Sequence, residues 1–396
     1  MDNRLRRARV ATHTVFALNG FVVGMWVVHI PAIEQRAGIS HATLGLLLLL
    51  LGGGAFLGMQ VAGPLADRFG ARVVVPVSAL LCTTALILPG LATSGFALAA
   101  ALLSLGFCNG ALDVSMNAHA VEVEHAYGRP IMSAFHGMWS IGGFLAALAG
   151  ARTLSWGWAP ATTFAVATAV TLVAAAAATP ALLRREPRPA TAGPRPKRGK
   201  TPGRIWAMAI VALLLMLAEG VANDWSVLHL SSVLDAPEST AALAYGFFAA
   251  AMTIGRLLTD RVVARFGQVA VVRYGSAIAA AGLLVTSLTP SIPVAIAGWT
   301  VFGIGLSGTV PQLFGAAGHF DRENSGANVS RVAGIGYLGM LAGPAMIGPM
   351  TNLMPLNLTF LLIVGYCLVA VAAAGILRPA AAQEAPSAEP QETAAP

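Results

Sequence analysis

The stretch GPLADRFGAR at residues 63–72 has a partial second copy in the same chain, GRLLTDRVVARFG at residues 255–267. Each copy follows a long apolar segment, and each carries an Asp-Arg pair followed by a Phe-Gly pair. Four extra residues, at 262–265, separate the Asp-Arg pair of the second copy from its Phe-Gly pair. Two such motifs at corresponding places indicate that the two halves of the chain are related.

Residues before these motifs repeat as well. Trp26 and His29 lie in one apolar segment, and Trp225 and His229 lie in a later one. Duplicated halves with a binding site between them are a recurrent plan of membrane transporters.

The composition places the chain in a membrane. Of its 396 residues, 56% are hydrophobic and 10% are charged, and the mean hydropathy is +0.73. Soluble domains carry about 25% charged residues because their surface must face water. A chain with so little charge must expose most of its surface to lipid.

The apolar segments are long enough for helices that cross a bilayer, which need about 20 residues each. Continuous apolar runs, without the alternation of a β-barrel, predict an all-α integral membrane protein with twelve transmembrane helices. The predicted spans are 11–31, 43–65, 73–91, 95–120, 131–150, 159–179, 205–228, 241–259, 270–288, 292–315, 329–350 and 356–377.

The basic residues predict the orientation, because cytoplasmic loops are enriched in Lys and Arg. If the N-terminus is cytoplasmic, the loops on the outer side contain only two basic residues, Arg36 and Arg152. Most other basic residues then fall in the cytoplasmic segments 1–10, 66–72, 184–204, 260–273 and 378. The net charge of +7 is therefore a topology signal, and nucleic acid is not expected as a partner. We expect a multi-pass protein of a bacterial cytoplasmic membrane, with the N- and C-termini both cytoplasmic.

Four regions follow from this pattern. A six-helix half at 1–183 is joined to a six-helix half at 205–378 by a basic, proline-rich linker at 184–204. The tail at 379–396 is rich in Ala, Pro and Glu. It has no apolar periodicity, and we expect it to be disordered.

The loop Gly-x-Leu-Ala-Asp-Arg-x-Gly at 63–70 resembles the signature of the major facilitator superfamily, and the span count, linker and second copy agree. The stretches at 113–117 (DVSMN), 136–140 (HGMWS) and 224–226 (DWS) resemble a bacterial branch of inner-membrane permeases with mostly unassigned substrates. The resemblance implies two pseudo-symmetric halves, a functional monomer, and secondary transport of a small solute by alternating access. It also implies that spans 1, 4, 7 and 10 line a central cavity.

The deep acids fit this expectation, since spans 3, 6, 9 and 12 contain none between their ends. They are Asp113 in span 4 and Glu219 in span 7, with Asp224 nearer the outer end of span 7. Asn117 shares a helical face with Asp113. A carboxyl group in a poorly hydrated cavity keeps its proton more readily than in water. Asp113 or Glu219 is therefore predicted to carry a coupling proton; the alternative is a structural hydrogen bond between helices.

Other polar and aromatic residues are weaker candidates. His136 could pair with Asp113 or relay protons, and Arg331 could bind an anionic substrate or an acid; both could instead be helix-end residues that reach the membrane interface. Further candidates for contact with the solute are the aromatic residues Trp26, Trp139 and Trp225 and the amides Asn19 and Gln312. For Trp225, anchoring at the membrane interface is the alternative.

By resemblance, the two repeated turns form a cytoplasmic gate. The acid would lie near a helix N-terminus and the arginine would pair with Glu122 or Glu124 at the end of span 4. The expected gate residues are Gly63, Asp67, Arg68, Gly70, Arg72, Asp260, Arg261, Gly267, Glu122 and Glu124. The alternative is that these charges only orient the chain.

The predicted function is proton-coupled secondary transport of a small solute, with the proton gradient as the energy source and no cofactor. Proton antiport for efflux of drugs or metabolites is the alternative. A membrane-embedded enzyme or receptor fits less well, because the sequence contains no His/Cys cluster and no nucleophile motif, and no metal site is expected.

Overall fold

The first half of the chain forms seven helices around a shared core. The computed structural model describes residues 3–128, 131–183, 201–320 and 325–378. The helices of the first half are α1 (Asn3–Ala37), α2 (His41–Phe69), α3 (Ala71–Ala85), α4 (Ile87–Leu91), α5 (Gly95–Tyr127), α6 (Met132–Ser155) and α7 (Pro160–Ala178), with a 3-10 turn η1 at Thr179–Ala181.

The second half repeats this plan. Its helices are α8 (Gly203–Val233), α9 (Glu238–Leu288), α10 (Ile292–Leu306), α11 (Thr309–Phe320), α12 (Ser325–Met350) and α13 (Leu356–Ala373), with η2 at Ala374–Leu377. Helix α8 begins at Gly203, two residues inside the predicted linker. Residues 184–200 of that linker and the predicted tail lie outside the described residues.

Eleven helices in the described part of the chain are long and apolar enough to cross a membrane. One of them, α9, has 51 residues and leaves the helical conformation at Gly267. At 1.5 Å per residue a straight helix of this length would extend about 77 Å, more than twice the hydrocarbon core of a bilayer. The chain therefore turns at Gly267 and crosses a second time, which agrees with the twelve predicted crossings.

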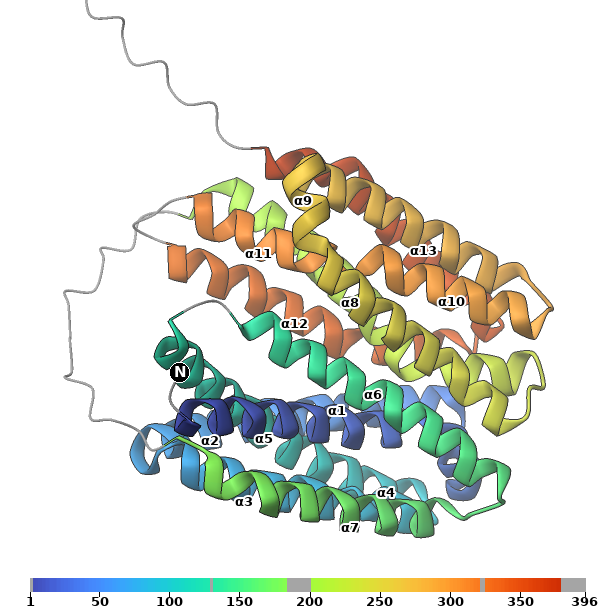
Figure 1. The fold of residues 1–396 in the computed structure, drawn as a ribbon. Coiled ribbons are helices and arrows are strands. Elements are labelled where there is room, and N and C mark those ends of the chain that lie inside the picture. Colours follow the sequence, from blue (N-terminus) through green and yellow to red (C-terminus); the bar gives the residue numbers. More distant parts are fainter. Residues whose placement is uncertain (1–2, 129–130, 184–200, 321–324, 379–396) are drawn as a thin grey trace, which may run out of the picture.

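The two halves lie side by side, with α1–α7 in the lower part of Figure 1 and α8–α13 in the upper part. The end of the bundle at which α1 begins and α2 ends is called the amino-terminal face, and the opposite end, at residues 38–40, the distal face. Across the boundary, α6 packs against α9 and α2 packs against α12. Within each half, α1 packs on α6 as α8 packs on α12, so the halves repeat one packing pattern.

One predicted span is broken. Span 10 is formed by α10 and α11, which are interrupted at Ser307 and Gly308. The break lies against α9, because a Cβ atom added to Gly255 would meet the side chain of Ser307. The apolar run at 292–315 predicts one continuous span, and the interruption depends on contact between helices.

Small residues let the helices of the first half approach closely. A Cβ atom at Gly58 would collide with the backbone of Phe107, and one at Gly110 would collide with the backbone of Ala55. These contacts hold α2 against α5, as glycines do in membrane helix pairs. Large apolar residues such as Val173, which is 71% exposed, cover the outside of the bundle, as expected for a surface that faces lipid.

Candidate functional site

An ion pair lies deep in the second half. Arg256 of α9 donates from Nη2 to Oε1 of Glu219 in α8 at 2.9 Å, and the two side chains are 27% and 11% exposed. Each residue lies near the middle of its membrane crossing. A charged side chain at this depth costs roughly 2.5–3.5 kcal/mol on insertion scales, so such residues normally face a partner or a cavity.

Tyr337 of α12 marks an open space beside this ion pair. The residue is 49% exposed. Its hydroxyl nevertheless lies within electrostatic reach of Asp113, Glu219 and Arg256. Asp113 belongs to α5 of the first half, whereas the other residues belong to the second. From an exposed tyrosine near partly buried charges of both halves, we infer a cavity between the halves.

Asp113 contributes a half-buried carboxyl group to this cavity. Asn117, one turn along α5, donates from Nδ2 to the backbone oxygen of Asp113 at 2.9 Å and to its Oδ1 at 3.3 Å. Among the residues that the structure describes, no basic side chain forms an ion pair with Asp113. The carboxyl group is therefore held by one amide and is otherwise free to bind a proton or a solute.

Asp224 lies further along α8, towards the distal face, and is also half-buried. Tyr245 of α9 lies within electrostatic reach of Asp224 and Glu219. The tyrosine is 1% exposed, and a Cβ atom at Gly143 of α6 would lie 2.7 Å from its hydroxyl. Tyr245 thus packs between the halves on the distal side of the ion pair.

His136 does not pair with Asp113 in the described part of the chain, contrary to one expectation. It lies four residues from the start of α6, whereas Asp113 lies fourteen residues from the end of α5. At 1.5 Å per residue the two differ in depth by roughly 15 Å. The His136 ring instead meets the edge of Phe16 at 5.3 Å between centroids, and it lies within electrostatic reach of Arg256.

Asn19 takes part in a buried network of the first half. Its Nδ2 donates to Oδ1 of Asn109 at 2.8 Å, and its Oδ1 accepts from Nε1 of Trp139 at 2.7 Å. Cys82 lies 3.9 Å from the same Asn109 oxygen. Because Asn19 is 1% exposed and both amide atoms have partners, it lies within the packing of the first half rather than on the open space.

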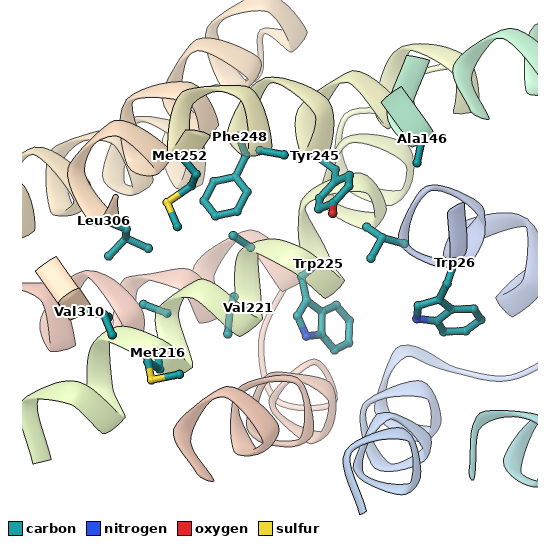
Figure 2. Packing of buried hydrophobic residues seen from close by; sticks show 14 of the residues in the cluster. Trp26, Ala146, Met216, Val221, Trp225, Tyr245, Phe248, Met252, Leu306 and Val310 are labelled. Atoms are coloured by element: carbon teal, nitrogen blue, oxygen red, sulfur yellow. The ribbon is translucent and has the colours of Figure 1, made fainter. Parts of the chain in front are cut away.

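The two tryptophans of the repeat are buried, at 2% for Trp26 and 0% for Trp225. Figure 2 shows both, with Tyr245 nearby. The interpretation of Trp225 as an anchor at the membrane interface is wrong, since no part of it reaches the surface. The histidines repeat a packing contact: His29 meets the edge of Phe164 at 5.0 Å, and His229 meets the edge of Phe360 at 5.3 Å.

Two further candidates lie in the second half. Arg331 is half-buried and donates from Nη1 to Oδ1 of Asn328 at 3.3 Å. It stands six residues nearer the amino-terminal face than Tyr337, at the mouth of the cavity rather than beside the ion pair. Gln312 of α11 is 8% exposed.

The two Phe-Gly turns share one backbone conformation. Gly70 has φ 81 and ψ 149, and Gly267 has φ 80 and ψ 163. Positive φ values of this kind are open to glycine and strained for other residues. Aligned on these glycines, Arg265 corresponds to Arg68 and Ala264 to Asp67, so the second turn has no acid at the equivalent place. The four-residue insertion moves Asp260 about one helical turn further back along α9.

The expected partners of Arg68 have other contacts. Oε2 of Glu124 accepts from the backbone N–H groups of Ile131 and Met132, both at 2.7 Å. This carboxylate therefore caps α6, and Glu122 lies 3.7 Å from Nδ1 of His119. Arg68 lies over the ring of Phe69 at 5.2 Å.

The other gate residues are exposed or half-buried. Asp260 and Arg261 are exposed on α9, and Gly63 and Arg72 are half-buried beside the first turn. The side chain of Asp67 lies outside the described part of the structure. In the described residues, no group of three or more His, Cys, Asp or Glu side chains could hold a metal ion.

Comparison with known proteins gives the family. The sequence pattern of the Major Facilitator Superfamily matches residues 12–344 and, in an overlapping second match, residues 209–396. The chain belongs to the major facilitator superfamily. Members of this superfamily are transporters and not enzymes, and this chain is a multi-pass secondary transporter.

The relatives and neighbours of this transporter agree on fold and class. It is 36% identical to an uncharacterized MFS-type transporter of Yersinia pestis over 357 residues, which cover 89% of this chain and 91% of the relative. It is 34% identical to an uncharacterized transporter of Sinorhizobium fredii, over 88% of this chain and 92% of the relative. The fold is similar to that of a mutant of the nucleoside transporter NupG, with a TM-score of 0.72, 15% identity, and 93% and 99% of the two chains covered.

The two halves of this transporter meet closely at the distal face. A Cβ atom at Gly45 of α2 would lie 2.7 Å from the Cα atom of Gly348 in α12, and one at Gly246 of α9 would lie 2.8 Å from Cβ of Ala147 in α6. His41 meets the edge of Trp225 at 6.1 Å, which joins the two halves at the same level. The cavity is therefore covered on the distal side, whereas the exposure of His136 near the start of α6 places its open side towards the amino-terminal face.

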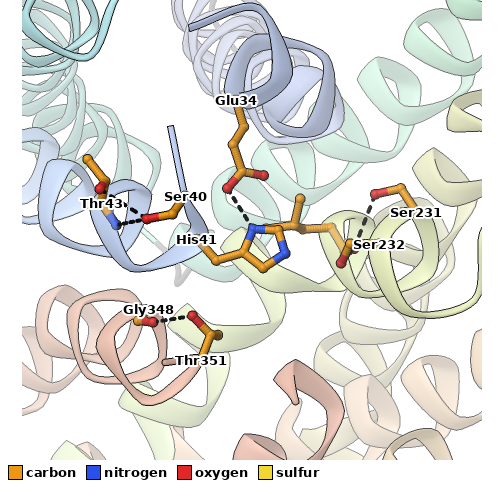
Figure 3. Close-up of polar contacts among 9 residues, drawn as sticks. Glu34, Ser40, His41, Thr43, Ser231, Ser232, Gly348 and Thr351 are labelled. Carbon is orange, nitrogen blue, oxygen red and sulfur yellow. Dashed lines mark hydrogen bonds and ion pairs between the residues drawn. The ribbon is translucent and has the colours of Figure 1, made fainter. Parts of the chain in front are cut away.

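A second hollow lies outside this distal contact. A pocket of about 580 Å³ is lined by Glu34 and His41 from the first half and by Ser231 and Glu238 from the second, among others. Nδ1 of His41 lies 2.6 Å from Oε1 of Glu34, as Figure 3 shows. This polar pocket is separated from Tyr337 and Asp113 by the contacts between the halves.

Proposed function

We propose that this protein is a proton-coupled transporter of an uncharged polar solute, which binds in the cavity between the halves, and that Asp113 carries the coupling proton. The observation that carries the proposal is the position of Asp113. Its carboxyl group lies within electrostatic reach of Tyr337 in the other half, which is also within reach of Arg256 and Glu219, and its side-chain partner is the amide of Asn117.

The ion pair favours Asp113 over Glu219 as the proton carrier. To load a proton, Glu219 would have to give up its contact with Arg256, and breaking a buried pair typically costs 3–5 kcal/mol because one charge is left alone. Asp113 has no such partner among the described residues. Burial of an unpaired carboxylate favours its neutral form, so Asp113 gains more from binding a proton.

The charges around the cavity favour an uncharged solute. Among the described residues inside the cavity, the carboxyl groups of Asp113, Glu219 and Asp224 accompany the guanidinium of Arg256, which Glu219 already neutralises, whereas Arg331 stands at the mouth. An anionic solute would add a further negative charge beside Asp113 at low dielectric. NupG, whose fold is similar, is named as a nucleoside transporter. Nucleosides and sugars belong to the class that the cavity charges favour.

The proposal includes an orientation. With the amino-terminal face in the cytoplasm, the short loops rich in arginine lie on the cytoplasmic side, in keeping with the positive-inside rule. The N- and C-termini would then both be cytoplasmic, in the cytoplasmic membrane of a bacterium.

Proteoliposomes test this function. Purified protein would be reconstituted with a pH-sensitive dye inside, and a proton gradient would be imposed while labelled sugars, nucleosides and organic acids are offered. We expect uphill accumulation of an uncharged solute, accompanied by proton flux in a fixed ratio. Asp113→Asn should abolish uphill accumulation but keep exchange of solute across the membrane.

Asp235→Asn is the matched control. Asp235 is exposed at the distal face and has a φ of 50, a conformation that Asn tolerates. Like Asp113→Asn, the Asp235→Asn change removes one negative charge, but it should leave transport unchanged. Proton flux opposite to the solute would indicate antiport, and uphill transport at the normal rate by Asp113→Asn would refute the role of this residue.

A further inference from the structure

A groove on the outside of the first half joins two arginines to an apolar wall. It lies between the start of α1 and the end of α7, at the amino-terminal face, and has a volume of about 560 Å³. Its α1 side includes Arg6, Arg7, Val10 and Thr14, and its α7 side includes Ala174 and Ala178. Pockets for small ligands commonly have volumes of 300–1,000 Å³.

The spacing of the lining residues along α1 shows which part of the groove lies deeper in the membrane. Arg7, Val10 and Thr14 recur at intervals of three and four residues, so they lie along one face of α1. The arginines come first, at the end of the bundle. Val10, which is 63% exposed, follows towards the middle of the membrane. The opposing wall of α7 is made of alanines, so the groove is basic at the end of the bundle and apolar below.

We infer that this groove binds an anionic phospholipid, with the phosphate at Arg6 and Arg7 and an acyl chain along the apolar wall. Arginine matches phosphate geometry with paired N–H donors, and basic pockets between transmembrane helices bind acidic headgroups. Arg6 and Arg7 are exposed, and among the described residues neither forms an ion pair.

The charge of the segment that follows α7 argues against its binding in the groove. The sequence continues from Leu183, two residues beyond the groove, into a segment at 184–200 that contains seven basic residues and a single acid. Such a segment would be repelled by Arg6 and Arg7 rather than attracted to them.

Native mass spectrometry of the delipidated protein tests the inference. The protein would be titrated with phosphatidylglycerol and with phosphatidylcholine of the same chain length. We expect phosphatidylglycerol to bind more tightly than phosphatidylcholine. A basic residue near the membrane surface contributes roughly 1 kcal/mol to the binding of an acidic lipid, so the ratio of the two affinities should fall about 5-fold for each arginine removed. The double variant Arg6→Ala/Arg7→Ala should bind the two lipids alike.

Two further variants separate charge from shape. Ala177→Trp fills the groove and keeps both arginines, so it should weaken the binding of both lipids. Arg265→Ala/Arg378→Ala removes the same charge from exposed positions of the second half and should keep the preference. Thermal unfolding in phosphatidylcholine checks that every variant is folded.

The outcomes are distinct. Equal binding of the two lipids by the unaltered protein, or a preference that survives Arg6→Ala/Arg7→Ala, would overturn the inference. Glycerol phosphate that competes as well as phosphatidylglycerol, together with no effect of Ala177→Trp, would assign the groove to a soluble phosphate instead. None of these results depends on whether the protein transports a solute.

Discussion

Gly70 and Gly267 adopt nearly the same backbone conformation, with φ values of 81 and 80, although four residues are inserted between the Asp-Arg pair and the second glycine. In each half the chain turns between two membrane crossings at this glycine. The duplicated feature is therefore the turn itself. The position of the Asp-Arg pair relative to the turn differs between the halves.

Gly70→Ala should destabilise the protein, because a side chain at this φ and ψ is strained. We expect a loss of about 1–3 kcal/mol in the free energy of unfolding, measured by thermal or denaturant unfolding in detergent. Gly365→Ala is the control, since Gly365 lies within α13 with open space around its Cα atom. It should be neutral or slightly stabilising. Equal effects of the two changes would contradict the strain at Gly70.

Arg256→Gln should be strongly destabilising, because it leaves the carboxylate of Glu219 deep in the bundle without its partner. A loss of about 3–5 kcal/mol is typical when one member of a buried pair is removed. The double variant Glu219→Gln/Arg256→Gln removes both charges and should recover much of that stability. Thermal unfolding of the two single variants and the double variant measures the coupling. Additive effects would show that the two side chains do not depend on each other.

Asn19→Ala should reduce stability without selectively weakening solute binding. It removes the partners of Asn109 and of the Trp139 indole, and each buried polar group left unsatisfied costs about 1–3 kcal/mol. Unfolding in detergent measures the loss, with the exposed Asn352→Ala as control. A normal melting temperature together with a large rise in KM would instead place Asn19 in the solute site.

A cysteine in the cavity should react faster with cationic than with anionic thiol reagents. Tyr337→Cys would be combined with Cys108→Ala, because Cys108 is half-buried whereas Cys82 and Cys367 are buried. Methanethiosulfonates with an ammonium or a sulfonate group would be compared, relative to their rates with a free thiol. A negative cleft raises the local cation concentration, and we expect a ratio of at least about 10-fold.

Two variants test whether the carboxylate of Asp113 causes the faster reaction of the cationic reagent. Asp113→Asn should lower the ratio and Asp235→Asn should leave it unchanged, since Asp113 lies within electrostatic reach of Tyr337 and Asp235 is exposed at the distal face. A faster reaction of the sulfonate reagent would show that the basic residues at the mouth of the cavity, rather than the acids inside, determine its charge.

The crossings and the repeat could be predicted because they depend on local features. Apolar runs define spans wherever the chain crosses lipid, and the Phe-Gly turns at Gly70 and Gly267 carry their own conformational requirement. The interruption at Ser307 and Gly308 could not be predicted in this way. It depends on the fit of α10 and α11 against Gly255, which belongs to another helix.

Arg256 was the largest omission from the predicted site. It lies inside the predicted span 241–259, where any arginine needs a partner, but its place four residues before Asp260 made it look like part of the repeated motif. Tyr337, Tyr245 and Asn109 were also missed. The direction in which each of them faces is determined by packing between helices of different spans, and spacing along one helix does not reveal it.

The carboxylate of Glu124 has a mechanical consequence. Because it holds the first two free amides of α6, the end of α5 and the start of α6 are fastened at the amino-terminal face by two charge-assisted bonds. A tilt of one helix must carry the other with it. Asp113 and His136, one on each helix, would then travel as a unit, and their separation in depth would stay constant while the two halves rock against each other.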